Sequence, residues 1–275
     1  MYVVFFDSLG PVYHLNTIAP QFTHEVLPMK RRHISLFAST LIAMTSLVAC
    51  AQNPTTQSIT IQEATYIPLT AKAGQGHKLA TFLTQGAAWV AQIEPNTTLW
   101  YALKKADGSF GIFDFFPNEA GRAEHFAGKV AAALKSNSDN LVANGWDKGV
   151  VANVNNFSVL SYKMPTGNHQ ATQATYIKLQ AQVGKEQALE NLLTGAVAIV
   201  AKTEPKTLLW TALKLNQNTY GIFDTFTDNS GRQAHFEGKV AAALKAQADS
   251  LIVGGWENGV LNNIHNFEIV AEAEK

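Results

Sequence analysis

The hydrophobic positions of this chain follow two spacings that come in a fixed order. Runs rich in β-branched and aromatic residues, bounded by turn-forming residues, are typical of strands. They occupy residues 66–71, 98–104, 110–116 and 153–162. Apolar residues three and four positions apart are typical of one side of a helix. They are Leu79, Leu83, Ala87 and Val90, and then Phe126, Val130 and Leu134. The pattern predicts strand, helix, strand, strand, helix, strand.

The whole pattern occurs a second time, 110 residues further on, with no insertion or deletion. The segments 64–67, 94–95, 111–114 and 128–135 recur as 174–177, 204–205, 221–224 and 238–245. Roughly half of the paired positions are identical, far above chance for a period this long. About a hundred residues is the size of a small domain rather than of a solenoid unit. We therefore expect two tandem repeats, at residues 64–165 and 174–275.

This order of elements predicts the fold class. It is the ferredoxin-like arrangement, which leaves one face of its antiparallel sheet without helices. That face has to be buried, and the other repeat is the obvious partner. We predict an α+β fold in which two ferredoxin-like (βαββαβ) repeats pack sheet to sheet as an intramolecular dimeric α+β barrel. Further association of such barrels stays open.

Local signals place the helix ends. Glu94-Pro95 and its repeat at 204–205 should end the first helix, because proline disfavours helical geometry in the residue before it. The second helix should begin at Asn118, and in the other repeat at Asp228 or Asn229, since these side chains cap free backbone N–H groups. It should run to residue 135, and to 245 in the second repeat.

The segment before the first repeat has the pattern of a secretory signal. A basic segment at residues 30–32 follows Met29, and a mostly apolar run extends from 34 to 49. The run is shorter than the roughly 20 residues of a membrane-spanning helix. Residues 29–49 are therefore expected to be a signal peptide. Residues 1–28 fit no part of one and are expected to be an extension from a misassigned start.

Cys50 completes the sequence LVAC, which resembles the bacterial lipobox, whose cysteine is acylated. It is the only cysteine in the chain, which fits a residue kept for lipid attachment rather than for a disulfide. A plain signal peptide with an incidental cysteine is the alternative. Residues 50–63, rich in Gln, Thr and Asn, predict a polar tether. We expect a lipid-anchored protein of the bacterial envelope that faces the periplasm and is held on the outer membrane.

Composition limits the function classes. Lys and Arg number 21, as do Asp and Glu, and no basic run follows residue 32, which argues against nucleic acid as a partner. The spacing of His, Cys and carboxylate residues matches no metal-site pattern, and neither a phosphate-binding glycine loop nor a GxSxG motif occurs.

The segments 99–103, 110–116, 121–122, 125–126 and 128–134 carry a more specific signal, and all of them recur closely in the second repeat. Together they resemble the antibiotic biosynthesis monooxygenase (ABM) domain family, and within it the quinol monooxygenase branch, from about residue 64 to 271. The resemblance implies a dimeric α+β barrel with a pocket between sheet and helices. It also implies oxygenation of an electron-rich phenol, quinol or anthrone by O₂ without a metal, a flavin or another cofactor. Such chemistry needs a dry cavity, a base and donors for the developing oxyanion.

His125 and His235 are the candidates for the base, because they are the histidines that occupy equivalent positions in the two repeats. Imidazole titrates near neutral pH. Arg122 and Arg232 lie three residues earlier, on the same side of the helix, and could neutralise a bound anion. The alternatives are structural: a histidine that is hydrogen-bonded near the helix start, and an arginine that pairs with a carboxylate.

Asp114 and Asp224 are the carboxylates predicted to form that pair. Asp114 alternates with Ile112 and Phe116, so it should project from the same sheet face as two apolar groups. A carboxylate in that position needs a partner. We therefore expect structural ion pairs of Asp114 with Arg122 and of Asp224 with Arg232.

Aromatic residues are the candidates for substrate contacts, with filling of the core as the alternative for those in strands. They are Trp100, Trp210, Tyr101, Phe115, Trp146 and Trp256. The second repeat has threonine in place of Tyr101 and Phe115. If these two residues face a pocket, the two sites differ in size and one of them could be inactive.

Three functions follow from these features. The first is an envelope-anchored, cofactor-independent monooxygenase of the ABM type that acts on small aromatic, quinol-like compounds. The second is a non-catalytic lipoprotein that binds a hydrophobic ligand or a partner. Haem degradation, known in the broader superfamily, ranks third, because the expected arrangement of Asn, Trp and His is not evident here.

Overall fold

The structure is a computed structural model that describes residues 60–167 and 170–275. Each half contains four strands with helices between them. The first half contains β1 (Glu63–Leu69), α1 (Gly76–Ile93), β2 (Leu99–Lys104), β3 (Phe110–Phe116), α2 (Glu119–Ala127), α3 (Lys129–Leu141), α4 (Gly145–Gly149), η1 (Val151–Asn153) and β4 (Asn155–Lys163). The second half contains β5 (Gln173–Gln180), α5 (Glu186–Thr203), β6 (Thr207–Lys214), β7 (Thr219–Phe226), α6 (Asn229–Phe236), α7 (Lys239–Leu251), η2 (Gly255–Val260), η3 (Leu261–Asn263) and β8 (Ile264–Glu274).

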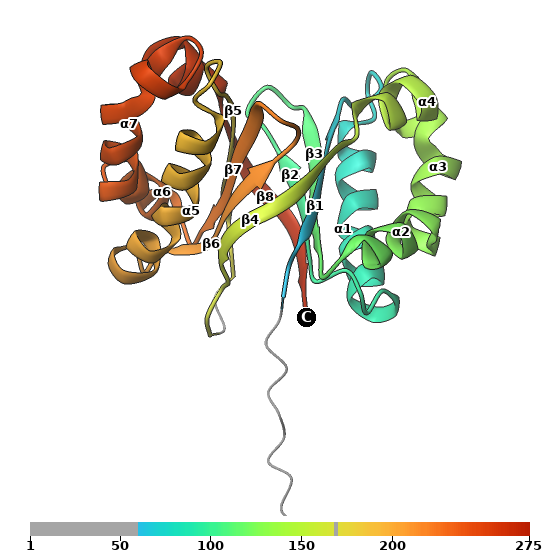
Figure 1. Cartoon of the computed structure of the whole chain (residues 1–275). Helices are drawn as coiled ribbons and strands as arrows, with labels where there is room; N and C mark the ends of the chain where they lie inside the picture. The colour runs from blue at the N-terminus through green and yellow to red at the C-terminus, as the bar shows by residue number, and fades with distance from the viewer. Residues whose placement is uncertain (1–59, 168–169) are drawn as a thin grey trace, which may run out of the picture. The chain divides into compact units, whose positions relative to one another are not determined.

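The strands close into one barrel in the order β1-β3-β2-β8-β5-β7-β6-β4. The last strand of each half joins the two halves: β4 pairs with β1 and then with β6, while β8 pairs with β5 and then with β2. Helices α1 to α4 lie on one side of the barrel and α5 to α7 on the other (Figure 1). The predicted α+β barrel is therefore present, as one closed sheet of eight strands.

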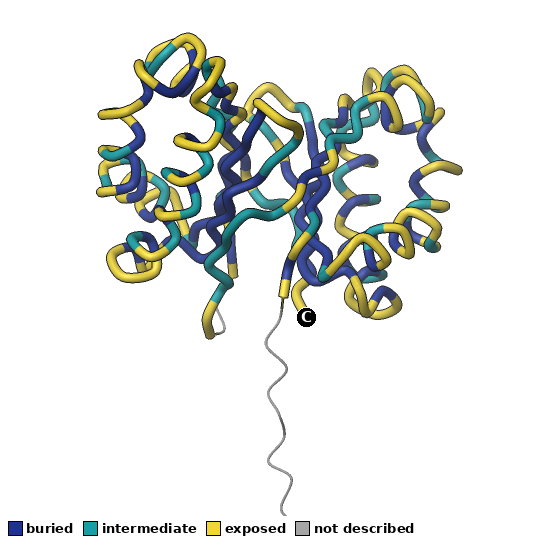
Figure 2. The backbone as a smooth tube through the Cα atoms, viewed as in Figure 1, coloured by how far each residue is buried: buried dark blue, intermediate teal, exposed yellow. Residues whose placement is uncertain are grey.

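Aromatic side chains fill the interior of the barrel. Phe113 of β3 stacks on Phe223 of β7 with ring centroids 3.9 Å apart, and Tyr101 and Phe115 belong to the same buried cluster. Because side chains alternate along a strand, the residues between them project outward, toward the helices. The burial pattern follows this arrangement: most strands are buried, β4 and β8 are largely half-buried, and the outer sides of the helices are exposed (Figure 2). An eight-stranded barrel of this kind is a packed core rather than a channel.

The helix ends confirm part of the local prediction. Asn118 and Asp228 cap α2 and α6 by accepting hydrogen bonds from the N–H groups of Gly121 and Gly231. The single second helix expected in each repeat is wrong, because the chain is extended at Gly128 (φ −80°, ψ 178°) and divides that helix into α2 and α3.

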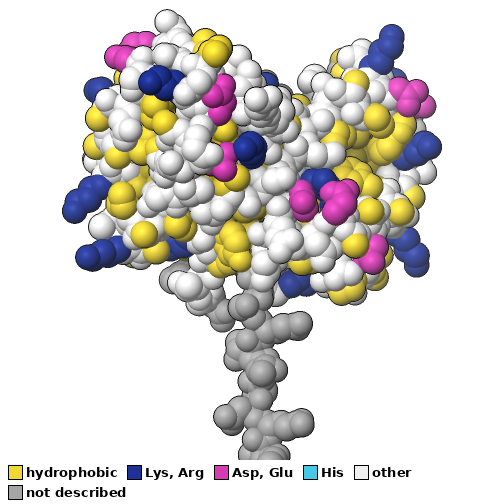
Figure 3. All heavy atoms as spheres, in the orientation of Figure 1, with side chains coloured by type: hydrophobic (Ala, Val, Ile, Leu, Met, Phe, Trp, Pro, Cys, Tyr) yellow, Lys and Arg dark blue, Asp and Glu magenta, His cyan; other side chains and the backbone are white. Residues whose placement is uncertain are grey.

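The barrel begins earlier in the chain than the sequence suggested. Ile61 is 1% exposed within the interior cluster, and the Gln62 N–H donates to the Phe116 carbonyl, although both residues were assigned to the polar tether. The predicted signal peptide and Cys50 lie outside the described residues. Among the described residues, no helix is both long and apolar enough to cross a bilayer. On the face shown in Figure 3, acidic and basic side chains are interspersed.

Candidate functional site

A glutamate, a histidine and an aspartate meet on the helix-covered side of the barrel in the first half. His125 Nδ1 lies 2.5 Å from Glu94 Oε2, and His125 Nε2 lies 3.3 Å from Asp114 Oδ2. Thr97 Oγ1 donates to the same Glu94 oxygen at 3.0 Å. The imidazole therefore lies between two carboxylates that come from different elements: Glu94 follows α1, Asp114 is in β3 and His125 is in α2.

Local sequence explains how Glu94 reaches the histidine. Pro95 ends α1 directly after Glu94, so this residue leaves the helix with non-helical geometry (φ −120°, ψ 79°). Gly128 supplies the space, because a Cβ at this position would lie 3.1 Å from Glu94 Oε1 and equally close to the His125 carbonyl oxygen. The break between α2 and α3 thus allows the carboxylate to approach the imidazole.

Burial controls the charges of the three groups. Asp114 is 0% exposed, His125 6% and Glu94 8%. Burial raises the pKa of Asp114 to about 7, against the opposing charge of His125. Burial alone would lower the pKa of His125, but its hydrogen bond to Glu94 and the charges of Asp114 and Glu94 together raise it. Near neutral pH, the site therefore combines a charged Glu94–His125 pair with an aspartate close to its own pKa.

The second half repeats this arrangement. His235 Nδ1 lies 2.5 Å from Glu204 Oε2, and His235 Nε2 lies 3.2 Å from Asp224 Oδ2. Burial again raises the aspartate pKa to about 7. No group of His, Cys, Asp and Glu side chains within residues 60–167 and 170–275 has an arrangement that could hold a metal ion.

In the first half, a cavity of ≈ 250 Å³ lies between the barrel and helices α1 to α3. Asp114 and His125 line it, whereas Glu94 does not. Its other lining residues are Ile67, Phe82, Leu83, Gly86, Trp100, Ile112, Phe126, Val130, Ala131, Leu134, Trp146, Val150, Val151, Val154 and Asn156. Asn156 accepts a hydrogen bond from Thr65 through its carbonyl oxygen at 2.9 Å, which leaves its NH₂ group as a donor. The walls are thus apolar, with one acid, one imidazole and one amide.

The corresponding region of the second half differs. A cavity of ≈ 250 Å³ lies there between α5 and α7, but neither Asp224 nor His235 lines it. Larger side chains occupy three positions that line the cavity of the first half, with Ala196, Leu261 and Ile264 in place of Gly86, Val151 and Val154. The smaller Leu192 replaces Phe82 and lines the cavity beside α5. In the first half the apolar cavity therefore reaches the histidine, and in the second half it does not.

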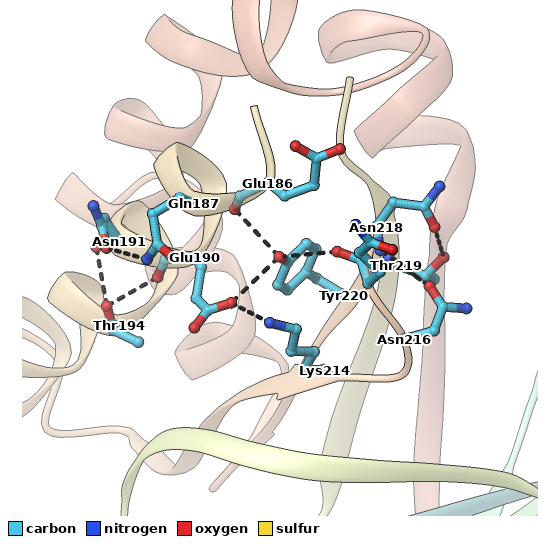
Figure 4. A network of polar contacts seen from close by, with 11 residues as sticks. Glu186, Gln187, Glu190, Asn191, Thr194, Lys214, Asn216, Asn218, Thr219 and Tyr220 are labelled. Carbon is cyan, nitrogen blue, oxygen red and sulfur yellow. Dashed lines mark hydrogen bonds and ion pairs between the residues drawn. The ribbon is translucent and has the colours of Figure 1, made fainter. Parts of the chain in front are cut away.

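A polar network ties α5 to the β6–β7 hairpin in the second half (Figure 4). Lys214 Nζ donates to Glu190 Oε2 at 2.6 Å, and the Tyr220 hydroxyl lies 3.3 Å from the same carboxylate oxygen and 3.2 Å from the Glu186 carbonyl oxygen. The first half has Ala80 and Phe110 at the positions of Glu190 and Tyr220, so it cannot form this network. Helix α1, a wall of the cavity, lacks the tie that holds α5.

Solved structures share this architecture. A proposed monooxygenase from Fusobacterium nucleatum superposes with a TM-score of 0.66 at 12% identity, covering 78% of this chain and 95% of its own. An anthrone oxidase-like protein gives a TM-score of 0.51 at 11% identity, covering 78% of this chain and 93% of its own. The chain has the fold of these monooxygenase-like proteins. A protein of unknown function from Nitrosomonas europaea is 38% identical, covering 38% of this chain and 94% of its own, with a TM-score of 0.34.

Neither family models nor curated proteins match this sequence. The monooxygenase-like fold therefore rests on structure, and the chemistry has to be argued from the site itself.

The predicted pairing of Asp114 with Arg122 is wrong. Arg122 Nη1 donates to Glu63 Oε2 at 3.0 Å, and Nη2 contacts Glu119. Asp114 contacts His125 instead, because the aspartate projects beneath α2 whereas the arginine extends along the outside toward β1. Arg232 likewise donates to Asn229 at 2.5 Å, while Asp224 contacts His235. Neither arginine lines the cavity beside Asp114.

The six aromatic candidates divide between three places. Trp100 and Trp146 line the cavity beside Asp114 and His125. Tyr101 and Phe115 point into the barrel interior, where the Tyr101 hydroxyl donates to Glu274 at 3.2 Å. Trp210 and Trp256 pack in the hydrophobic core beside α5 and α7. Trp210 and Trp256 do not line the cavity between α5 and α7, whereas their counterparts Trp100 and Trp146 line the cavity of the first half.

Three features of the site escaped the sequence analysis. The Glu94-Pro95 pair and its repeat were used only as helix ends, although a glutamate retained in both repeats was also a signal. Asn156 is retained as Asn266 and was not considered. Gly86 gave no signal in the sequence, because the space left by its missing side chain matters only through the residues packed around it. A Cβ at this position would lie 3.5 Å from the Trp100 ring.

Proposed function

We propose that this chain is a cofactor-independent monooxygenase of the ABM type that oxidises small phenols, quinols or anthrones in the cavity of the first half. The observation that carries the proposal is an apolar cavity whose charged lining residues are Asp114 and His125. The fold shared with monooxygenase-like proteins, one of them anthrone oxidase-like, agrees with it. Apolar walls with a few converging polar groups are typical of a small-molecule site.

Asp114 has the properties of the base. A desolvated carboxyl with a pKa of about 7 can take the proton of a bound phenol near neutral pH. The protonated His125 next to it stabilises the negative charge that remains, and the NH₂ group of Asn156 is a further donor for the substrate oxygen. Glu94 and His125 also line a pocket on the outer surface, so the proton can leave through the imidazole toward solvent.

The reaction needs no other oxidant than O₂. The substrate anion passes one electron to O₂, and the resulting radical and superoxide combine into a peroxide at a ring carbon. Loss of water from the peroxide leaves a carbonyl group. For a hydroquinone, one molecule of substrate and one of O₂ give a hydroxyquinone and water. The protein contributes the dry cavity, the base and the charge opposite the developing anion.

The first half is proposed as the active one. His235, Asp224 and Glu204 repeat the polar groups, but the apolar cavity between α5 and α7 reaches neither His235 nor Asp224. His235 and Glu204 line a different pocket, which Asp224 does not reach. We further propose that the chain arose by fusion of two ABM-like domains, and that the second half now serves mainly to close the barrel and hold β4 and β8 in register.

Attachment to the bacterial envelope through Cys50 is part of the same proposal and rests on the sequence alone. The barrel is compatible with it, because β1 begins at the same end of the barrel as the C-terminus (Figure 1).

The test compares aerobic and anaerobic incubation of the full chain with a series of hydroquinones and anthrones, followed by O₂ uptake and ¹⁸O₂ incorporation into the product. We expect O₂-dependent product that disappears in Asp114→Asn and persists in the matched Asp224→Asn. His125→Ala and His235→Ala should differ in the same direction. Absence of labelled product with every substrate would contradict the proposal.

A second function, binding of a hydrophobic ligand without turnover, is favoured by one observation. Both carboxylate oxygens of Asp114 are sealed from solvent without a geometrically good hydrogen bond, so a ligand must displace its surroundings slightly to reach them. Tight retention of an aromatic ligand that is not oxidised, unaffected by Asp114→Asn, would favour this alternative.

A further inference from the structure

A second cavity, of ≈ 410 Å³, lies at the end of the barrel that carries the β2–β3 turn and α4 (Figure 1). None of the residues that line the cavity beside Asp114 also lines this one. Both halves contribute to it. The first half supplies residues of β1, the β2–β3 turn, α4 and β4, and the second half supplies Tyr176, Lys178, Asn263 and His265.

Two tyrosines from equivalent positions form the floor. The rings of Tyr66 and Tyr176 lie with their centroids 5.0 Å apart, and the residues are 7% and 4% exposed. Neither hydroxyl has a hydrogen-bond partner among the described residues, and neither is sealed from solvent. Burial raises the pKa of each hydroxyl well above its usual range, so both stay protonated and can donate a hydrogen bond to a ligand.

The strands beneath these rings are adapted to them. A Cβ on Gly111 would lie 2.9 Å from Tyr66 Cε2, and one on Gly221 would lie 3.0 Å from Tyr176 Cε2. Glycine weakens the interior of a strand, and it often marks a place where another group approaches the backbone closely. Both repeats have the glycine and the tyrosine, so the close contact of ring and backbone occurs in both halves of the floor.

The rim carries positive charge. Lys105, Lys148 and Lys178 line the cavity together with His265, whereas no carboxylate does. Asp107 pairs with Lys105 at 3.4 Å, but it is exposed and lies outside the lining. Asn153, Asn155, Asn263 and Ser109 add further polar groups. Donors and cations therefore converge on a cavity with no carboxylate in its lining, and the charge of Asp107 acts on Tyr66 and His265 from outside it.

The lysines and the histidine of the rim are not repeated, and burial together with the charge of Lys105 lowers the pKa of His265, so the lysines carry the positive charge. The positions equivalent to Lys105, Lys148, Lys178 and His265 hold Leu215, Asn258, Pro68 and Asn155. Both halves contribute a tyrosine to the floor, but each charged residue of the rim occurs in one half only. The cavity is therefore asymmetric and suits one ligand rather than two related by the repeat.

We propose that this cavity binds a small oxyanion, a carboxylate or phosphate group, between the two tyrosine hydroxyls and the three lysines. Hydroxyl and ammonium donors suit the several lone pairs of such oxygens, and charge-assisted hydrogen bonds of this kind are the strong ones. Lysine is a common phosphate ligand that acts as a point charge. The proposal is independent of the oxygenation chemistry, because the two cavities share no lining residue.

The experiment titrates the full chain with inorganic phosphate, malonate and citrate by calorimetry, at constant ionic strength set with chloride. NMR follows the imidazole signals of His265, with those of His77 as a reference outside the cavity. We expect saturable binding of at least one probe and a selective shift of His265. The ranking of phosphate against the carboxylates identifies which oxyanion the site prefers.

Two variants test the assignment. Tyr66→Phe with Tyr176→Phe removes the hydroxyls and keeps the rings, and we expect it to weaken binding about tenfold. Lys148→Gln with Lys178→Gln should weaken it at least as much, whereas Lys202→Gln, an exposed lysine on α5, should not. Absence of saturable binding at concentrations up to about 10 mM, or binding that both double variants leave unchanged, would overturn the proposal.

Discussion

Replacing Asp114 by asparagine should make the protein more stable near pH 8 while abolishing its proposed activity. Asparagine has the same shape and can accept a hydrogen bond from His125 Nε2 through its amide oxygen. It cannot ionise, so it removes the cost of a charge in a place that is 0% exposed. Functional groups held in unfavourable surroundings commonly trade stability for activity in this way.

The magnitude follows from the carboxyl pKa, which is about 7 in the folded protein and about 3.9 in an unfolded chain. Between these values the folded protein keeps a proton that the unfolded chain has released. The stability that comes from the neutral carboxyl is therefore present below pH 4 and is lost as the pH rises to 7. At 1.36 kcal/mol per pH unit, the interval corresponds to roughly 4 kcal/mol. Relaxation and water entry reduce such penalties, so we expect a gain of about 2 kcal/mol for the variant at pH 8.

Urea denaturation of wild type and variant at half-unit steps from pH 4 to 8 measures the difference directly. The two free energies of unfolding should agree near pH 4 and separate steadily above it. Asp224→Asn is the matched control, because Asp224 is equally buried and its pKa is also raised to about 7 by burial. It should show the same pH dependence without loss of product. A variant that is less stable than wild type at pH 8, or a difference that does not change with pH, would refute the reasoning.

Three further substitutions test other parts of the site. Gly86→Ala should gain about 0.5–1 kcal/mol from helix propensity and lose affinity for ring-shaped ligands, as thermal denaturation and ligand titration would show. Glu94→Gln should lower the pKa of His125, because the imidazole loses its hydrogen-bonded anion. An NMR titration measures this pKa, and an unchanged value would contradict the prediction. Glu190→Gln should cost only about 0.5–1 kcal/mol, because its ion pair with Lys214 is partly exposed; product formation should stay at the wild-type level.

Much of the fold could be predicted because it depends on local periods. Alternation along β3 placed Asp114 on the same side as Ile112, and both line the same cavity. Spacing along α1 identified its buried side, and Asn118 marked the start of α2. The break at Gly128 could not be predicted, since it accommodates a carboxylate that arrives from the end of α1.

The sequence by itself determined the repeat, the order of strands and helices, and the residue types that carry the chemistry, because these depend on neighbours along the chain. Only the tertiary structure decided which groups meet. Glu94 and His125 are separated by 31 positions, and their contact depends on how α1 and α2 pack against the barrel. Gly86 lines the cavity that His125 also lines, whereas its counterpart Ala196 lines a cavity that His235 does not reach. Such contacts depend on how distant segments pack together, so no local pattern of residues predicts them.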